Sequence, residues 1–212
     1  MSLAKIALRP SGFRAFNRVN PFRCYASSAD KYKEHCVVPD LLKCPPKEDA
    51  TVCWPTGAKA NFGNCLTPEK VKDIPKVSWQ AQPGCFYMVC MLDIDAPCRK
   101  APSERSWLHW LVGNVPGCEI CKGCCLVGYL GALPAEGTGL HRYVVLVYKQ
   151  KGKQEYKEKK IDANCPDGRA KFCLSKFIEK YCLVDPPQAG NFFQAQWECY
   201  VNKKMESLKC CD

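Results

Sequence analysis

Two of the three histidines, His109 and His141, are the side chains best suited to bind a small molecule. Histidine can donate or accept hydrogen bonds, and its ordinary pKa places a change of charge near neutral pH. His109 lies inside an apolar run, and His141 opens another such run just after a glycine-rich segment. A single histidine in such a position usually has a structural role, so a functional site requires further polar groups nearby.

Two carboxylates, Asp93 and Asp95, follow an apolar run and precede Pro97. Residues at i and i+2 at the end of a strand point to one side, and buried carboxylates are costly unless donors surround them. A neighbouring histidine is such a donor, and Asp93 would then orient it. The alternative is that both carboxylates cap a turn by accepting backbone N–H bonds. We expect Asp95 to cap the turn and Asp93 to face a pocket.

The segment Gly131–Gly139 is predicted to be a loop beside these side chains, because it contains several glycines and Pro134. Backbone N–H groups in such a loop can approach an oxyanion closely. A loop of this kind is a weak signal alone, but beside two histidines and Asp93 it predicts a site for a small anion. Binding through histidine N–H groups would be stronger when the imidazolium form is populated.

Hydrolysis or phosphoryl transfer by a His–Asp pair is the enzymatic alternative. Such chemistry needs a group to activate, yet neither motif places a serine or cysteine obviously within reach of the histidines. No phosphate-loop or kinase-type motif is present in the sequence. We therefore expect a binding protein that is not an enzyme and that uses no cofactor and no metal.

Three apolar runs are predicted to be the buried strands that hold these groups, over 85–92, 107–115 and 141–148. They are too short for typical helices and rich in aromatic or β-branched residues. A short strand is expected over 50–54, an amphipathic helix over 169–182, a short helix near the C-terminus, and an extended arm over 30–46. Strands outnumber helices without βαβ alternation, so we predict an antiparallel or mixed β-sandwich with peripheral helices.

The composition is that of one globular domain, with 212 residues of which 47% are hydrophobic and 25% charged. No apolar run is long enough to cross a bilayer. The formal net charge is +10, but five basic residues lie in the acid-free segment 1–25, which leaves only +5 for the rest. This mild charge and the lack of nucleic-acid motifs argue against a nucleic-acid partner. We expect a monomeric single domain over 26–212.

Residues 1–25 are arginine-rich, acid-free and interspersed with apolar residues, which is typical of a mitochondrial presequence, with cleavage after Tyr25. An inert, disordered basic tail is the alternative, and a secretory signal is disfavoured because no apolar core follows the first charge. The expected location is therefore mitochondrial or cytoplasmic.

Eighteen cysteines are present, and several occupy apolar positions, as Cys85 and Cys90 do. Because a buried free cysteine behaves as a small hydrophobe, we expect mostly reduced thiols. The cluster over 118–125 is interpreted as a hairpin in a cysteine-rich chain. A metal site or a redox pair is the alternative there.

Two blocks resemble the signature of the phosphatidylethanolamine-binding proteins, also called Raf-kinase inhibitor proteins. They are DIDAPCRKAPSERSWLHWLVGNVPG, residues 93–117, and GTGLHRYVVLVYKQ, residues 137–150. Weaker similarity over 66–79, 169–181 and 194–201 extends the resemblance to roughly residues 36–208. It implies a mostly β, two-sheet sandwich of that family's type with peripheral and C-terminal α-helices.

The resemblance also implies non-enzymatic binding of phosphatidylethanolamine headgroups or other phosphate-like anions in a small pocket, with peripheral membrane contact. Inhibition of a protein kinase or a serine protease through the surface, with the pocket as a switch, is the alternative. A cis Ala96–Pro97 bond is expected. By motif position, the implied ligand-binding residues are Asp93, Pro97, Trp107, His109, Gly131, Pro134, His141 and Tyr143.

Two pocket positions depart from the family pattern. Leu133 stands where the family usually has glycine, so we expect strain if φ is positive there and a narrower mouth. Met205 stands where the last helix often carries tyrosine, which removes a hydroxyl from the lid.

Overall fold

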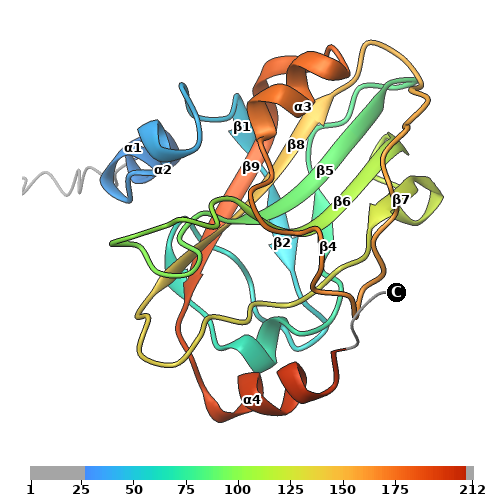
Figure 1. The fold of residues 1–212 in the computed structure, drawn as a ribbon. Coiled ribbons are helices and arrows are strands. Elements are labelled where there is room, and N and C mark those ends of the chain that lie inside the picture. Colours follow the sequence, from blue (N-terminus) through green and yellow to red (C-terminus); the bar gives the residue numbers. More distant parts are fainter. Residues whose placement is uncertain (1–26, 209–212) are drawn as a thin grey trace, which may run out of the picture.

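The computed structural model describes residues 27–208, and the candidate presequence over 1–25 lies outside them. Figure 1 shows a layered β fold with its helices at the periphery. The helices are α1 (Ser28–Glu34), α2 (Val37–Asp40), α3 (Leu174–Lys180) and α4 (Cys199–Glu206), with 3-10 turns η1 (Pro68–Val71) and η2 (Ile120–Lys122). The strands are β1 (Glu48–Asp49), β2 (Thr51–Cys53), β3 (Asn64–Cys65), β4 (Lys76–Ser78), β5 (Phe86–Asp93), β6 (Trp107–Pro116), β7 (Cys124–Val127), β8 (His141–Lys149) and β9 (Val184–Ala195).

A seven-stranded mixed sheet has the order β1-β9-β8-β5-β6-β7, with β3 also paired to β9. Strands β5, β6 and β8 coincide with the three predicted buried strands and pair antiparallel, whereas β1 and β3 run parallel to β9. A second sheet joins β2 and β4. The predicted mostly β, two-sheet architecture with peripheral and C-terminal helices is confirmed. Both faces of the large sheet are covered, which explains why its central strands are apolar throughout.

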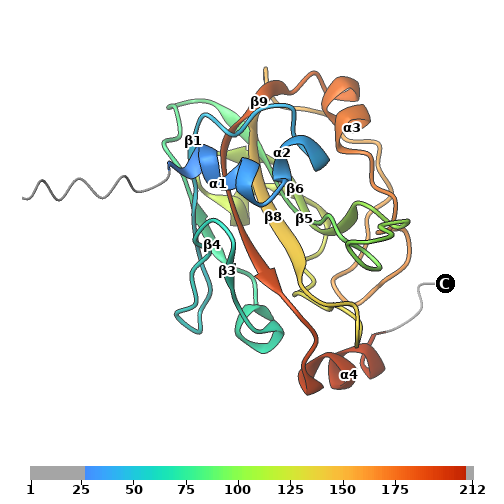
Figure 2. The ribbon, with the colours of Figure 1, turned by 90° about the vertical axis from the view of Figure 1, so that its left-hand side faces the viewer.

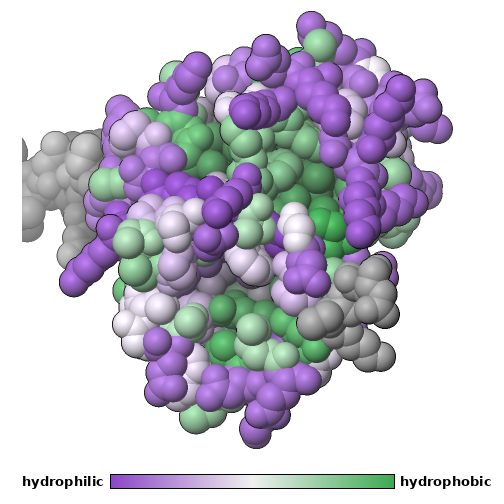
Figure 3. Space-filling view, in the orientation of Figure 1, coloured by the Kyte–Doolittle hydropathy of each residue, from purple (hydrophilic) through white to green (hydrophobic). Residues whose placement is uncertain are grey.

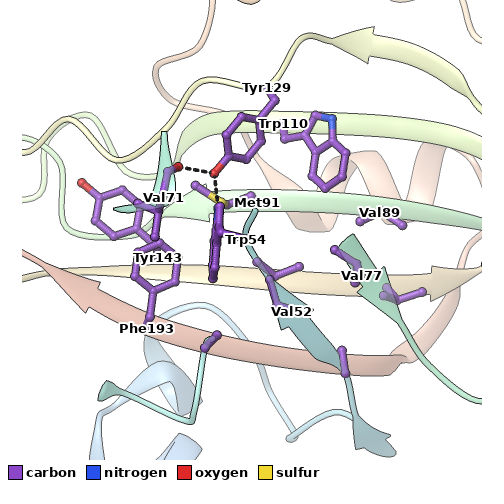
Figure 4. Packing of buried hydrophobic residues seen from close by; sticks show 14 of the residues in the cluster. Val52, Trp54, Val71, Val77, Val89, Met91, Trp110, Tyr129, Tyr143 and Phe193 are labelled. Carbon is purple, nitrogen blue, oxygen red and sulfur yellow. Dashed lines mark hydrogen bonds between the residues drawn. The ribbon is translucent and has the colours of Figure 1, made fainter. Parts of the chain in front are cut away.

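Aromatic and β-branched side chains fill the space between the two sheets (Figure 4). The Trp54 ring meets the Phe193 ring edge-on, with 5.1 Å between their centroids. Its indole N–H donates to the Tyr129 hydroxyl at 2.8 Å, and that hydroxyl donates to the Val71 carbonyl at 2.7 Å. The polar atoms of this core are thereby satisfied while η1 is tied to the sheets.

The other face of the large sheet is covered by α1, α2 and α3, on the side away from β2 and β4 (Figure 2). The prediction of an extended arm over 30–46 is wrong. Ser27 and Asp30 form a capping box that starts α1, because each side chain accepts the other's backbone N–H. Tyr32 then packs on Phe192 at 5.0 Å between ring centroids, so tertiary burial stabilises this short helix.

The predicted helix over 169–182 begins only at Leu174. Lys171 has a left-handed φ of 59°, and backbone carbonyls hold the buried Arg169 side chain in an irregular segment. The apolar spacing therefore continues beyond the residues that are helical.

Strand β9 is a long element that the sequence pattern did not predict, and it includes Pro186 and Pro187. These prolines lie before the pairing with β1, which begins at Ala189. The ladder between β8 and β9 is also irregular beside them, after Val147. Proline, which lacks an N–H group, is tolerated at such positions.

The cysteines of residues 27–208 are free thiols except Cys165, which forms a disulfide. Most cysteines of this part of the chain are therefore reduced, as predicted. Between Ser27 and Leu208 no helix has both the length and the apolar character needed to cross a membrane.

Candidate functional site

A cavity of about 170 Å³ lies where β5 ends and β6 and β8 begin. We call it the histidine cavity. Figure 3 shows it as the lower of two apolar hollows on this face, next to α4. Its lining combines a few polar groups with many apolar ones: Asp93, Ala96, Pro97, Glu104, Trp107, His109, Leu130, Leu133, Ala135, His141, Pro166, Met205 and Leu208.

Asp93 ends β5 and lies beside the start of β8, where the ladder pairs it with Tyr143, two residues from His141. Two residues along a strand share a face, so His141 and Asp93 meet. The His141 Nδ1 atom is 2.8 Å from Asp93 Oδ2, while Asp93 Oδ1 accepts the Asp95 backbone N–H at 2.8 Å. Asp93 therefore performs both roles that were expected of the two carboxylates, facing the pocket and capping the turn.

The second nitrogen of His141, Nε2, is 2.8 Å from the Thr138 hydroxyl, which donates its proton to the Ala135 carbonyl at 2.7 Å. Both ring nitrogens of His141 therefore lie within hydrogen-bond distance of a protein group, Asp93 on one side and Thr138 on the other.

His109 lies in a different environment, because its Nδ1 donates to the Leu130 carbonyl at 2.8 Å. Burial lowers the pKa of His109 to about 4, and the opposing effects of the Asp93 charge and the Leu130 bond are smaller. Near neutral pH the ring is uncharged with its proton on Nδ1, so Nε2 can only accept a hydrogen bond. This differs from the expectation that both histidines donate to a ligand.

Asp95 does not cap the turn; it forms a buried ion pair with Arg142. Its carboxylate accepts bonds from Arg142 Nε at 2.8 Å and Nη2 at 2.6 Å, and Arg142 also reaches Asp40 of α2 at 2.8 Å. Burial would raise the pKa of Asp95, but the bonds and charge of Arg142 hold that pKa below its ordinary value. The network fixes α2 and the Asp93 turn to β8.

Of the residues predicted for the site, Asp93, Pro97, Trp107, His109 and His141 meet in the cavity lining. The remaining three lie outside that lining, and their positions are described next. The Ala96–Pro97 bond is cis, as expected.

Gly131, Pro134 and Tyr143 are buried and lie outside the lining. A side chain on Gly131 would lie 2.9 Å from the Val71 carbonyl oxygen, so glycine lets the loop approach η1. Tyr143 is fully buried and stacks on Phe193 with 5.1 Å between centroids. Burial and the nearby Asp93 charge raise the pKa of Tyr143 well above its ordinary value, so its hydroxyl stays protonated.

The two departures from the family pattern both lie in the cavity lining. Leu133 has no positive φ, so the expected strain is absent, but its side chain does border the cavity. Met205 of α4 is half exposed at the same opening.

Glu104 is a lining residue that the sequence pattern did not identify. It lies in the loop between β5 and β6, and its carboxylate is 3.5 Å from Lys171 Nζ. Its position follows from the hydrogen bonds of that loop to residues after Arg169, which no local pattern reveals.

The cysteine cluster lies in the turn between antiparallel β6 and β7, so the hairpin interpretation is confirmed. Within residues 27–208 no group of three histidine, cysteine or acidic side chains is arranged to hold a metal ion.

Comparison with known proteins gives one consistent result. The family model described as phosphatidylethanolamine-binding protein matches residues 56–193. The "Putative odorant-binding protein A5" of Drosophila melanogaster is 40% identical over 194 residues, which cover 88% of this chain and 92% of the relative.

Solved structures share the fold. The solution structure of CG7054 is 34% identical with a TM-score of 0.66, covering 82% of this chain and 98% of that one. A carboxypeptidase Y inhibitor, crystallised with its cognate proteinase, is 23% identical with a TM-score of 0.68, covering 81% of this chain and 95% of its own. The fold, the extent of the family match and the identity to relatives agree: this chain belongs to the phosphatidylethanolamine-binding protein family.

Proposed function

We propose that this protein binds, without transforming it, a phosphate-bearing headgroup of the phosphatidylethanolamine class in the histidine cavity. The observation that carries the proposal is that each carboxylate of the lining has a partner. Asp93 lies 2.8 Å from His141, and Glu104 lies 3.5 Å from Lys171, which is outside the lining. A zwitterion suits such a site better than a strongly anionic ligand does.

The hydrogen-bonding groups of the cavity also favour a ligand that brings its own donors. His109 Nε2 and the Glu104 carboxylate can accept bonds, and no lysine or arginine is among the described residues that line the cavity. A primary ammonium group supplies donors for both acceptors, whereas a quaternary ammonium supplies none. The phosphate would take donors from backbone N–H groups of the 131–139 loop and from His141 Nε2, in exchange for the contact of that atom with Thr138.

The size of the cavity supports a headgroup rather than a whole lipid. At about 170 Å³ it is smaller than the roughly 300–1,000 Å³ of pockets that enclose drug-sized ligands. Leu133, Met205 and Leu208 border the opening and would meet the apolar part of the ligand.

Binding without catalysis is supported by the chemistry of the lining. No serine, threonine or cysteine is among the described residues that line the cavity. The Thr138 hydroxyl lies beside His141, but it donates to the Ala135 carbonyl and is outside this lining.

Isothermal titration calorimetry with glycerophosphoethanolamine tests the proposal. The headgroup should bind wild type, and His141→Ala should lose most of the affinity. His35→Ala is the matched control, because His35 lies outside the lining. Equal affinities of wild type and His141→Ala would show that the headgroup does not bind in the histidine cavity.

Selectivity gives a second arm of the same experiment. Glycerophosphocholine should bind more weakly than glycerophosphoethanolamine. The substitution Glu104→Gln should reduce this preference by up to about fivefold, the effect of one partly exposed charge pair. An unchanged preference would contradict the assigned role of Glu104.

The names of similar proteins suggest two other partners. An odorant-like apolar molecule would suit the leucine and methionine side chains at the opening. A serine protease, or a protein kinase as the family resemblance implies, would be bound through the surface, and for the protease the named inhibitor is the precedent. Inhibition of either enzyme that persisted in His141→Ala would favour surface binding over the cavity.

A further inference from the structure

A second and larger cavity, of about 450 Å³, lies under α3 on the same face of the molecule. We call it the α3 cavity. Figure 3 shows it as the upper apolar hollow, separated from the histidine cavity by a band of more polar residues. Its volume falls within the range of small-molecule pockets, in contrast to that of the histidine cavity.

The floor of the α3 cavity is apolar. Leu108 and Leu111 of β6 and Val127 of β7 form it, with Ile161 and Phe177 at the sides. These floor residues face the layer packed by α3, opposite to the core between the sheets. The cavity is thus suited to a hydrocarbon group, because burying apolar surface is its main source of affinity.

The segment 149–173 connects β8 to α3 (Figure 1), and its residues between 158 and 172 form the wall around this floor. Tyr156 holds the first part of this segment against β6. Its ring lies so close to Gly113 that a side chain at position 113 would collide with the ring. Arg169 fixes the last part of the segment by donating to the carbonyls of Leu108 and Gly128. The segment is therefore anchored at both ends, and these anchors define the shape of the cavity.

Among the described residues, five charged ones line the cavity: the basic Lys159 and Lys160 and the acidic Glu158, Asp162 and Asp167. Lys159 and Lys160 border the cavity, and no carboxylate among the described residues lies within ion-pair distance of either. Glu158 is already paired with Lys180 at 2.5 Å. Asp162 and Asp167 also line the cavity, so the anionic end of a ligand would lie beside the two lysines and away from these carboxylates.

We propose that the α3 cavity binds a single-chain anionic amphiphile, such as a fatty acid. The hydrocarbon chain lies on the floor of β6 and β7, and the anionic head is held by Lys159 and Lys160. This site is independent of the histidine cavity, because the two linings share no residue.

The test is calorimetric titration of the full chain with decanoate, dodecanoate and dodecyltrimethylammonium. Dodecanoate should bind one to one and up to about tenfold more tightly than decanoate, as expected for burial of two more methylenes. The cationic amphiphile should bind more weakly. Equal or tighter binding of the cation, or no binding of dodecanoate, would overturn the proposal.

Matched variants locate the site. The double substitution Lys159→Glu/Lys160→Glu should weaken dodecanoate binding by about fivefold or more, whereas Lys151→Glu/Lys153→Glu on the same segment should not. Ile161→Trp should fill the cavity and abolish binding, and Ile74→Trp, at an exposed position, is its control.

A variant of the other cavity separates the two sites. Leu133→Trp narrows the histidine cavity and should leave dodecanoate affinity unchanged. Loss of dodecanoate binding in Leu133→Trp, with wild-type affinity in Ile161→Trp, would assign the amphiphile to the histidine cavity and overturn the proposal.

Discussion

At the scale of residues, two histidines that border one cavity have different hydrogen-bond partners. The ring nitrogens of His141 lie 2.8 Å from the Asp93 carboxylate and 2.8 Å from the Thr138 hydroxyl. His109 is buried, donates to the Leu130 carbonyl and remains neutral near neutral pH. The sequence identifies both histidines, but Asp93 and Leu130 reach them only through the fold.

The buried neutral state of His109 predicts a loss of stability in mild acid. The unfolded chain takes up this proton near pH 6.5, whereas the folded protein does so only near pH 4. Unfolding therefore binds a proton between these values, and the free energy of unfolding falls as pH decreases through this interval. The contribution reaches roughly 3 kcal/mol by pH 4.

Urea unfolding at a series of pH values measures this effect. His109→Asn places an amide N–H where Nδ1 donates to Leu130 and does not titrate. Its stability should therefore fall less steeply than that of wild type between pH 6.5 and 4. Parallel curves for the two proteins would show that His109 does not titrate as described.

At the scale of elements, the irregular segment before α3 supports both cavities through one buried side chain, that of Arg169. The Arg169 guanidinium makes no ion pair with any described residue, and burial lowers its pKa to about 10. It donates instead to six backbone carbonyls, those of Leu108, His109, Gly128, Asp162, Ala163 and Cys165. Because Leu108 borders the α3 cavity and His109 the histidine cavity, this side chain supports both.

Replacement of Arg169 should therefore be strongly destabilising. Arg169→Lys retains the charge but supplies too few donors, and the unpaired carbonyls should reduce the free energy of unfolding by about 3 kcal/mol. Lys171→Met, at an exposed neighbour, should change it by less than about 0.5 kcal/mol. Chemical denaturation compares the two, and a loss below about 1 kcal/mol for Arg169→Lys would contradict the account.

The capping box of α1 predicts a smaller effect. Ser27→Ala removes the side-chain acceptor for the Asp30 N–H and should cost about 1 kcal/mol. Ser28→Ala, one residue later and without this role, is the control. Similar denaturation midpoints for both variants would show that the capping box adds nothing to stability.

At the scale of the whole molecule, local pattern and family motifs predicted the two sheets and one end of the large sheet as the binding region. Continuous apolar runs identified β5, β6 and β8 because both faces of those strands are buried. The pattern failed for β9, whose prolines lie where pairing is irregular, and for α1, which depends on burial of Tyr32. It also missed Glu104, since that side chain reaches the cavity only through contacts between loops.

The N-terminal segment gives a prediction about processing. We propose mitochondrial import with cleavage after Tyr25, on the basis of the basic, acid-free composition of residues 1–25. Cleavage there leaves Ser27, and so the cap of α1, in place. Mass spectrometry of the protein from its native cells should find Ala26 at the N-terminus, and an intact N-terminus would argue for the cytoplasm.

The central claim, that a zwitterionic headgroup occupies the histidine cavity, is tested most directly by NMR of the histidine rings. The chain has three histidines, of which two border the cavity and His35 does not. Titration with glycerophosphoethanolamine should shift the ring resonances of His109 and His141 in a saturable manner and leave those of His35 unchanged. Unchanged signals from His109 and His141 at saturating ligand, or equal shifts of all three histidines, would contradict the account.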